Sequence, residues 1–429
     1  MNVLRVGWAE APLSDLAEET RGSIVPGAGT TYELWSVPAF PTRRPEILDG
    51  SEIGSAKRPV QPGDVLLCKI NPRINRVWQV APAAADRPQV ASTEYVVMRT
   101  AHPALSAYLV WFLQSPRFRE WIKLSVEGAT GSHTRAKSGP ILRQVVPVPP
   151  LNEQRRIVAA IEEHLSRLDA ADASLGAATA RALALRAGIV ADALAGDWPV
   201  RQLRDVTASQ VYGTSAKASV DPSGVPVLRM GNISDGKLDV SSLKYLPAAH
   251  PDVSKFDLEV GDILFNRTNS PELVGKSAVF EGRERMTFAS YLIRVRLTEE
   301  CDPRWAVLAI NGPSGRRYVA EVRTQQVGQA NVNGTKLAAM PIPVPPLEEQ
   351  RRIVARVEEQ LAAVYALRAA IERAQRRSGS LRRAVLERAF RGELVPQDPT
   401  DEPAEALLTR IRAARAAENS KPRRASHSR

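Results

Sequence analysis

The strongest pattern in the chain is a stripe of apolar residues at near-heptad spacing, and it occurs twice. The first stripe runs through residues 152–195 and the second through residues 348–391. An apolar residue at every third or fourth position is typical of a long helix that packs lengthwise on another helix. At about 1.5 Å per residue, each predicted helix would span roughly 66 Å. The stripe residues are Ile157, Ile161, Leu165 and Leu168 in the first segment and Val354, Val357, Leu361 and Val364 in the second.

Both predicted helices begin with nearly the same residues, 196 positions apart. The two copies read PVPPLNEQRRIV from Pro147 and PVPPLEEQRRIV from Pro343. Proline fixes its own φ and restricts the residue before it, so each PVPP run should end the element that precedes it. Gly196 and Gly392 follow the last apolar positions and are expected to stop the helices. We expect the two helices to pair antiparallel within one chain; pairing between two chains is the alternative.

A block of mixed character precedes each helix, and the two blocks are related. GDVLLCKIN at 63–71 matches GDILFNRTN at 261–269, and apolar, β-branched runs after a Gly-Asp turn indicate strands. Helical segments follow in residues 104–124 and 304–322. The predicted fold class is therefore α+β: two tandem α+β domains and two long antiparallel helices that form a coiled-coil-like spacer, all from a pseudo-twofold duplication. The predicted boundaries are 1–146 for the first domain, 147–196 for the central helix, 197–342 for the second domain, 343–396 for the C-terminal helix, and 397–429 for a tail with a short helix (402–417) and a disordered basic end.

The overall charge favours a polyanionic partner. The 429 residues carry a formal net charge of +11. Basic residues that neutralise phosphates release condensed counterions, which favours nucleic acid, although a basic tail alone would also raise the charge. Cys68 and Cys301 are far apart, which argues against a disulfide framework or a thiolate metal site. Neither a signal peptide nor a membrane-spanning apolar run is visible, so we expect a cytoplasmic protein without membrane contact.

The sequence offers little that suggests catalysis. VGKS at 274–277 resembles the end of a phosphate-binding loop, but Ser270 stands where that loop needs its first glycine. NPRI at 71–74 lacks the second proline and the aromatic residue of an adenine methyltransferase loop. The five histidines are scattered without metal-ligand spacing. We therefore expect no catalytic residue and no metal site; an enzyme with an unrecognised site is the alternative.

Polar loops remain as candidates for function, because they follow corresponding strands in the two blocks and recur near the end of each block. Arg can read guanine, Asn or Gln can read adenine, and Lys can anchor phosphate. The alternative is that these residues only form turns. The candidate DNA-binding residues are Lys69, Asn71, Arg73, Arg76, His133, Arg135 and Lys137 in the first block and Arg229, Asn232, Asn266, Arg267, Thr268, Asn269, Lys276, Gln329, Asn331 and Lys336 in the second.

Taken together, these segments resemble the specificity (S) subunits of type I restriction–modification enzymes. The resemblance is carried by the doubled PVPPL…EQRRIV segment, by VLRMGNI…GDILFNRTNSPELVGKSAVF and by the ending AFRGELVPQDPTDEPAEALLTRI, and it covers essentially the whole chain. It implies two target-recognition domains, each reading half of a split, asymmetric site on double-stranded DNA from the major groove. It also implies that the long helices act as the spacer between them.

The resemblance further implies the partners. Two methyltransferase (M) subunits, which carry S-adenosylmethionine, would methylate an adenine in each half-site after flipping it from the duplex. Two restriction (R) subunits, which use ATP and Mg²⁺, would join in systems that have them. The S subunit itself would be non-catalytic and would bind no cofactor directly. A stand-alone DNA-modifying enzyme and a structural coiled-coil adaptor are the competing hypotheses.

Overall fold

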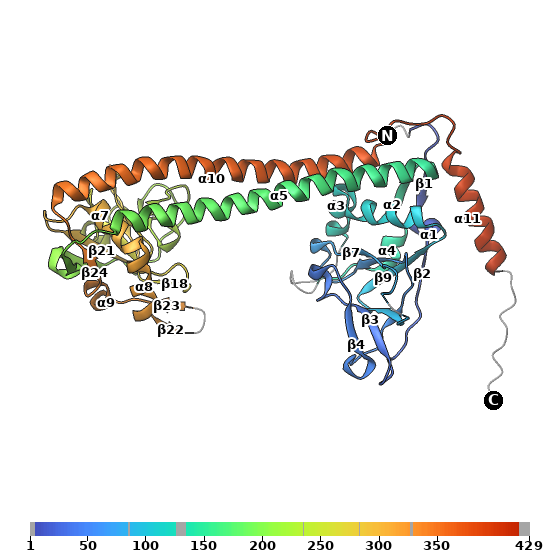
Figure 1. The fold of residues 1–429 in the computed structure, drawn as a ribbon, viewed down its shortest axis with the longest axis horizontal. Coiled ribbons are helices and arrows are strands. Elements are labelled where there is room, and N and C mark those ends of the chain that lie inside the picture. The colour runs from blue at the N-terminus through green and yellow to red at the C-terminus, as the bar shows by residue number, and fades with distance from the viewer. Residues whose placement is uncertain are drawn as a thin grey trace. The chain divides into compact units, whose positions relative to one another are not determined.

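The chain forms two compact units, and each long helix contributes to both. The computed structural model describes residues 5–84, 86–125, 134–234, 236–282, 284–326 and 329–419. Unit 1 comprises Met1–Ser174 and Ala374–Arg429, and unit 2 comprises Leu175–Arg373. Helix α5 (Leu151–Leu194) and helix α10 (Leu347–Phe390) therefore each begin in one unit and end in the other (Figure 1).

Unit 1 contains a domain with two four-stranded sheets. The first sheet is antiparallel with the order β2-β9-β6-β7, and the second has the order β4-β3-β8-β5, in which β3 and β8 are parallel. The elements are β1 (Ala9–Pro12), α1 (Leu13–Leu16), β2 (Ala17–Glu19), β3 (Thr31–Trp35), β4 (Glu46–Asp49), β5 (Arg58–Pro59), β6 (Val65–Cys68), β7 (Val77–Gln79), β8 (Gln89–Ala91), β9 (Tyr95–Thr100), α2 (Pro103–Gln114), α3 (Pro116–Leu124), α4 (Ser138–Leu142) and β10 (Val145–Val148).

Unit 2 repeats this plan. Its main sheet has the order β12-β21-β17-β19, and a second sheet has the order β16-β13-β20, in which β13 and β20 are parallel. The elements are β11 (Val200–Gln202), β12 (Thr207–Tyr212), β13 (Val225–Leu228), β14 (Ile233–Ser234), β15 (Lys237–Leu238), β16 (Lys244–Leu246), α6 (Pro251–Lys255), β17 (Ile263–Asn266), β18 (Thr268–Asn269), β19 (Ser277–Val279), β20 (Thr287–Phe288), β21 (Leu292–Leu297), α7 (Pro303–Asn311), α8 (Pro313–Val322), β22 (Thr324–Gln326), β23 (Gln329–Asn331), α9 (Gly334–Ala338) and β24 (Pro341–Pro343).

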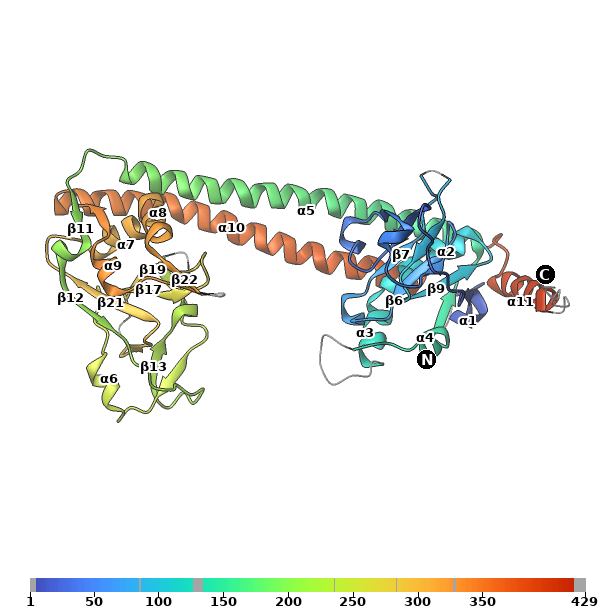
Figure 2. The same ribbon diagram turned by 90° about the horizontal axis from the view of Figure 1, so that it is seen from below.

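The shared topology confirms the α+β duplication predicted from the sequence. In both domains the strand from the Gly-Asp repeat is central: β6 lies between β9 and β7, and β17 lies between β21 and β19. Both strands are apolar apart from Asn266, because both of their faces are buried, as at Leu66 and Leu264. The helices α2 and α3 follow β9 in the chain as α7 and α8 follow β21 (Figure 2).

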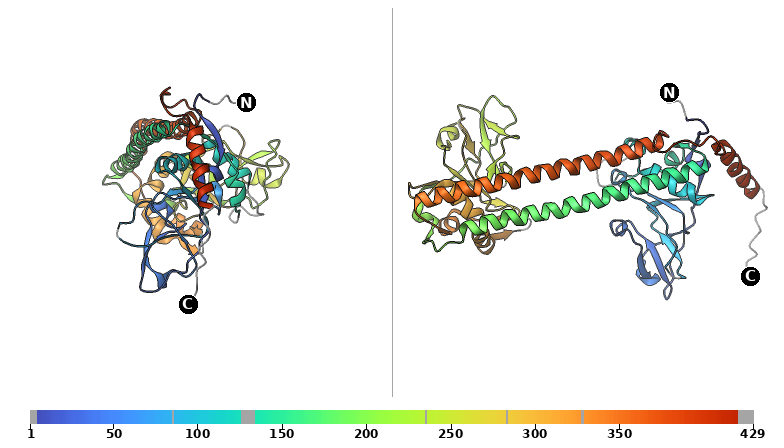
Figure 3. Two further views of the ribbon diagram at one scale, coloured as in Figure 1. Left: turned by 90° about the vertical axis from the view of Figure 1, so that its right-hand side faces the viewer. Right: turned by 45° about the horizontal axis from the view of Figure 1, so that its top comes forward.

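Within each unit, α5 and α10 lie side by side and run antiparallel (Figure 2 and Figure 3). In unit 1 the start of α5 packs on the end of α10, where Ile161 and Leu386 share a core cluster. In unit 2 the start of α10 packs on the end of α5, where Val357 and Val190 share a core cluster. The prediction of antiparallel pairing within one chain is therefore confirmed, and each helix begins and ends one residue earlier than predicted.

The predicted stripe residues are buried, but the helices do not cover them alone. Seven of the eight are buried, and Leu168 is half-buried. The cluster that holds the unit 1 stripe also contains Leu13 of α1 and Tyr108 and Phe112 of α2. The stripe is thus one side of each domain core, and this is what fixes the domains on the helices.

The glutamine of the repeated PVPPL…EQRRIV segment forms a hydrogen bond between the start of each long helix and the proline turn before it. Gln154 is fully buried, and its Nε2 donates to the Pro149 carbonyl at 2.9 Å. Gln350 is equally buried, and its Nε2 donates to the Pro345 carbonyl at 2.7 Å. A buried carbonyl needs a donor, and the side-chain amide supplies it at the start of both helices. This structural role accounts for the repetition of the motif at both helix starts, and it requires no catalytic function.

The two predicted helix stops differ from one another. Gly392 has φ of 72°, and the Glu393 N–H donates to the Arg388 carbonyl at 2.8 Å. This is typical of an α-helix that is terminated by a residue in the left-handed conformation. Gly196 has an ordinary negative φ and is instead required by packing, because a Cβ at this position would clash with the Trp198 indole.

Helix α11 (Ala404–Asn419) packs against unit 1. Leu408 and Ile411 are buried in the core cluster of that unit. The helix begins and ends two residues later than the predicted range of 402–417. The end that is predicted to be disordered, residues 420–429, lies outside the described residues.

We predict that Gln350→Leu destabilises unit 2 by about 2–3 kcal/mol, because several buried groups lose a partner. Besides Pro345, Gln350 donates to the Glu300 carbonyl at 3.0 Å and accepts from the Asp302 N–H at 2.8 Å. Gln154→Leu should cost only about 1 kcal/mol, since Oε1 of Gln154 has no partner among the described residues. Urea unfolding followed by tryptophan fluorescence measures both, and equal losses would contradict this difference.

Glu153 and Glu349 hold the same place in the repeat but lie in opposite surroundings. Glu153 is buried and accepts from the Trp8 indole N–H at 3.1 Å, and burial raises its pKa. Glu349 is partly exposed, and the Arg352 guanidinium lowers its pKa.

We predict that Glu153→Gln raises the melting temperature at pH 7. A raised carboxyl pKa means that the folded protein holds the proton more tightly, so stability falls as pH rises from about 4.3 through the raised value. Glutamine still accepts a hydrogen bond from Trp8 but carries no charge, so the loss of stability with rising pH should disappear. Glu349→Gln is the matched control and should bring no gain in melting temperature. A carboxyl group whose pKa is lowered in the folded protein stabilises the fold at pH values above its ordinary pKa. Calorimetry across pH 4–8 checks this, and a similar gain in both variants would contradict it.

Candidate DNA-recognition surfaces

The structure brings the two polar segments of unit 1 together as the unit 1 loop pair (residues 69–76 and 134–137). The Asn71 N–H donates to the Thr134 carbonyl at 2.9 Å, and the Ala136 N–H donates to the Lys69 carbonyl at 3.0 Å. Asn71 has φ of 51°, a left-handed conformation that asparagine tolerates better than most residues. Segments far apart in the chain therefore form one surface beyond the end of β6.

The exposed cations of the unit 1 loop pair remain candidates for DNA contact. Arg73, Arg135 and Lys137 are exposed, whereas Lys69, Asn71 and Arg76 are half-buried. Nε of Arg73 donates to Oδ1 of Asn71 at 2.7 Å, and Arg135 pairs with Glu94 at 2.7 Å. Burial lowers the pKa of Lys69. The remaining predicted residue, His133, lies outside the described residues.

A small sheet of order β18-β23-β22 joins the polar segments of unit 2 as the unit 2 loop pair (residues 266–276 and 324–336). Thr268 lies opposite Asn331, and Nδ2 of Asn331 donates to Oγ1 of Thr268 at 2.7 Å. The pair follows the central strand β17 as the unit 1 loop pair follows β6. The two domains therefore present polar loops at equivalent places.

Arg267 has the surroundings expected of a side chain that binds an external acceptor. Its guanidinium carbon lies 4.7 Å from the centre of the Tyr212 ring. Its Nε is buried without a hydrogen-bond partner among the described residues. The Tyr212 hydroxyl accepts from the Gly334 N–H at 2.7 Å, which ties the ring to the second segment of the loop pair. Stacking orients an arginine while leaving its N–H donors available.

Three residues that the sequence predicts to bind DNA instead hold the fold. Asn232 is buried, and its Nδ2 donates to two backbone carbonyls at 2.8 and 3.0 Å. Asn266 is only 1% exposed in the middle of the domain. Nζ of Lys336 donates to the carbonyl of Val322, the last residue of α8, at 2.5 Å. Asn232 and Lys336 would have to give up these hydrogen bonds to reach DNA, and Asn266 would have to leave its buried position, so the exposed loop residues are the stronger candidates.

The other predicted residues of unit 2 lie at or near the surface. Gln329 is exposed, and Arg229, Arg267, Thr268, Asn269, Lys276 and Asn331 are half-buried. Two aromatic residues beside Arg267 are not among the predicted site residues. Tyr212 lies 55 positions earlier in the chain, and no spacing in the sequence connects the two. Tyr291 is 50% exposed, and its backbone carbonyl accepts from the Arg267 N–H at 3.0 Å.

The groups that a catalytic reading would use have structural surroundings among the described residues. These residues contain no group of three or more His, Cys, Asp or Glu placed to hold a metal ion. Burial raises the pKa of Cys68, and that of Cys301 to about 12, so neither thiol is ionised at neutral pH. His102 and His250 cap α2 and α6 through Nδ1. Ser277 of the VGKS run begins strand β19, whereas a phosphate-binding loop would open a helix here. In the same ranges no helix has both the length and the apolar character needed to cross a membrane.

Known proteins share both the sequence and the architecture. A family model described as the type I restriction modification DNA specificity domain matches residues 195–372, which all lie in unit 2. The EcoKI specificity subunit of Escherichia coli K12 is 26% identical over 350 residues, covering 76% of this chain and 75% of that protein. The StySPI specificity subunit of Salmonella potsdam is 25% identical, covering 73% of each. Residues 195–372 therefore match the type I restriction modification DNA specificity domain, and the chain is similar to type I restriction enzyme specificity subunits over about three quarters of its length.

Solved structures show the same fold. A chain from a structural study of complex assembly and conformational transition in a type I system is 22% identical, with a TM-score of 0.73, covering 91% of this chain and 99% of that one. The HsdS subunit of Thermoanaerobacter tengcongensis is also 22% identical, with a TM-score of 0.51, covering 91% and 98%. The family model leaves the first domain unmatched, but its topology is that of the second.

We predict that Arg267→Ala weakens binding of the complex that contains this chain to its own DNA site by about 1–3 kcal/mol, the usual worth of a bidentate contact to a base. Arg285→Ala is the matched control, because Arg285 is an exposed arginine of the same unit that is already paired with Asp257 at 3.0 Å. Tyr212→Leu should cause part of the Arg267 loss, and Tyr212→Phe should cause less because the ring remains. Titration of labelled duplexes measures these affinities, and equal effects of the two arginine variants would reject a specific role for Arg267.

Proposed function

We propose that this chain is the non-catalytic component that recognises DNA sequence in a type I restriction–modification complex. Each domain would read one half of a split, asymmetric site from the major groove through its own loop pair. The helix pair would set the separation of the two half-sites. The subunit would thereby place methyltransferase and restriction subunits on the same site.

The main support is the contrast between scaffold and loops. The two domains share sheet order, helix positions and the site of the loop pair. The residues in the loops do not match: unit 1 has INPRINR at 70–76, where unit 2 has RTNSPELVGK at 267–276. Phosphate contacts would be served by similar cations in both loops, whereas base contacts depend on the particular side chains. Two different loop sets on one scaffold favour recognition of two different half-sites.

The expected partners supply the chemistry. Two methyltransferase subunits would carry S-adenosylmethionine and methylate an adenine in each half-site. Restriction subunits, in systems that have them, would use ATP and Mg²⁺. The contribution of this chain itself would be to bind and orient DNA. Such a complex would work in the cytoplasm, where its DNA substrate lies.

A domain exchange tests the proposal. Residues 197–342 would be replaced by the corresponding domain of another specificity subunit, and methylated adenines would be mapped across the genome in cells that carry the methyltransferase. We expect one half of the methylated site to change and the other half to stay. A change in both halves would reject independent reading, and methylation by the purified chain alone would support a stand-alone enzyme.

A further inference from the structure

The backbone hydrogen bonds at the ends of the two central strands show which loop residues of the two domains are equivalent. In unit 2 the Arg267 N–H, directly after β17, donates to the Tyr291 carbonyl at 3.0 Å. In unit 1 the Lys69 N–H, directly after β6, donates to the Glu94 carbonyl at 2.8 Å. Arg267 therefore occupies the place of Lys69, and Tyr291 occupies the place of Glu94.

The turn that contains Glu94 or Tyr291 supports this correspondence. In both units it makes one further backbone bond within the turn and one to the end of the neighbouring strand, β3 or β13. These bonds join the Tyr95 N–H to the Ser92 carbonyl (3.0 Å) and the Ser92 N–H to the Trp35 carbonyl (3.1 Å) in unit 1, and the Leu292 N–H to the Ala289 carbonyl (2.9 Å) and the Ala289 N–H to the Leu228 carbonyl (2.9 Å) in unit 2. Because the backbone is held in the same way, side chains at equivalent positions leave it at equivalent places.

Unit 2 places two arginines and two aromatic rings around this turn. Arg229 follows the last residue of β13 as Arg267 follows the last residue of β17, and we call them the strand-end arginines. Nε of each is buried without a hydrogen-bond partner among the described residues. Arg267 stacks on Tyr212, and Tyr291 is exposed. Buried donors without a partner are costly, so this surface favours an acceptor from outside the protein.

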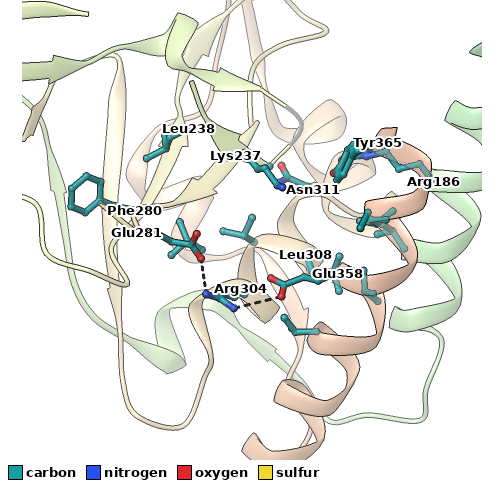
Figure 4. Close-up of a pocket in the computed structure, with 18 of the residues that line it drawn as sticks. Arg186, Lys237, Leu238, Phe280, Glu281, Arg304, Leu308, Asn311, Glu358 and Tyr365 are labelled. Atoms are coloured by element: carbon teal, nitrogen blue, oxygen red, sulfur yellow. Dashed lines mark ion pairs between the residues drawn. The ribbon is translucent and has the colours of Figure 1, made fainter. Parts of the chain in front are cut away.

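Other arginines of the same domain are neutralised within the protein. Arg304 pairs with Glu281 at 2.9 Å and with Glu358 at 3.5 Å (Figure 4). Arg285 pairs with Asp257 at 3.0 Å. The unpaired Nε atoms of the strand-end arginines are therefore a local feature of the turn and not a general property of the domain.

Unit 1 carries a carboxylate on the equivalent surface. Glu94 is half-buried, and its Oε1 accepts from the Arg135 guanidinium at 2.7 Å. The strand-end arginines are absent, because Ser36 follows β3 and Lys69 follows β6. An acceptor that an arginine holds in place therefore stands where unit 2 has an aromatic ring beside two arginines.

The two surfaces suit opposite edges of a base pair. In the major groove, guanine offers the acceptors O6 and N7, which match the two donors of an arginine. Cytosine N4 and adenine N6 are amino donors, which a carboxylate accepts. A carboxylate that faces base acceptors instead finds no donor, and a group left unpaired in this way is costly. Opposite chemistry at equivalent positions would therefore select different bases.

We propose that these equivalent positions determine the base that each unit reads. Unit 2 reads a guanine through Arg267, which Tyr212 orients, and Arg229 adds positive charge beside it. Unit 1 reads a base that bears an amino group, cytosine or adenine, through Glu94, which Arg135 orients. This inference rests on the proposed function and names the chemistry that each surface recognises.

A guanine analogue tests the contact in unit 2 at the level of single atoms. The site would first be defined by mapping methylated adenines, and the domain exchange assigns each half to its unit. The complex of the chain with its methyltransferase subunits would then be titrated with labelled duplexes. 7-Deazaguanine, which lacks the N7 acceptor, should weaken wild-type binding about tenfold at one guanine of the unit 2 half-site, the usual effect of losing a hydrogen bond to a charged group. Arg267→Ala should bind the normal and the modified duplex equally.

Two further analogues test unit 1 and distinguish the two candidate bases. Pyrimidin-2-one in place of cytosine, or purine in place of an adenine other than the methylated one, removes only the amino group. One of these changes should weaken wild-type binding about tenfold at one position of the unit 1 half-site. Glu94→Ala should remove that effect and leave the response to 7-deazaguanine in the other half unchanged.

Matched controls are exposed residues that are already paired. Arg285 pairs with Asp257, and Glu402 pairs with Arg410 at 2.6 Å. Arg285→Ala and Glu402→Ala should respond to every analogue as the wild type does. Circular dichroism checks that each variant is folded, and Arg267→Lys and Glu94→Gln replace any alanine variant that is not.

The outcomes separate this inference from the proposed function. Sequence-specific binding in which the analogues affect the wild type and the matching variant equally would overturn base reading by Arg267 and Glu94 and leave the proposed function standing. A complex that binds every duplex with the same affinity would overturn both. A loss of affinity in Arg267→Ala that is the same for every duplex would indicate a phosphate contact and reject the reading of guanine.

Discussion

The single apolar stripe on each long helix is the constraint on which the rest of the structure depends. A 44-residue helix owes most of its stability to packing rather than to its intrinsic propensity, and each fully buried Ile or Leu contributes about 1.5–3 kcal/mol. Here the stripe is covered partly by the other helix and partly by a domain core. Ile157 and Ile161 share a cluster with residues of α2, α10 and α11. Neither core is complete without both helices, so the helices and domains stabilise one another.

The duplication keeps what this packing requires and relaxes the rest. Gln154 and Gln350 both close a proline turn, because every helix that starts this way leaves a buried carbonyl in need of a donor. The glutamate beside them is free to differ: Glu153 is buried against Trp8, while Glu349 pairs with an arginine near the surface. Similar sequence can therefore conceal different electrostatics, since burial is set by the elements packed around a residue.

Recognition depends on groups that the scaffold leaves unsatisfied. In the unit 2 loop pair, several groups are already bonded within the protein: Asn331 donates to Thr268, and Oδ1 of Asn333 accepts from the Lys336 N–H. Arg267 differs from them, because its guanidinium stacks on the Tyr212 ring and its Nε has no hydrogen-bond partner among the described residues. A rigid frame with a few open donors loses little conformational entropy on binding. It also permits a different set of open donors in each domain without disturbing the fold.

The sequence by itself determined the long helices to within one residue and the duplicated α+β architecture, whereas it left open whether the helices pair within one chain or between two. The helices and the duplicated architecture follow from apolar periodicity and from internal repetition, which are properties of the chain read in order. The tertiary structure alone decided which polar residues are available. Asn232 and Arg267 look equally suited to DNA in the sequence, yet one spends its amide on backbone carbonyls and the other stacks on a tyrosine 55 residues away. The physical reason is that the identity of a polar side chain does not reveal where its hydrogen bonds are made. The same residue can bond inside the protein or remain open to a ligand, and only its neighbours in space distinguish these two cases.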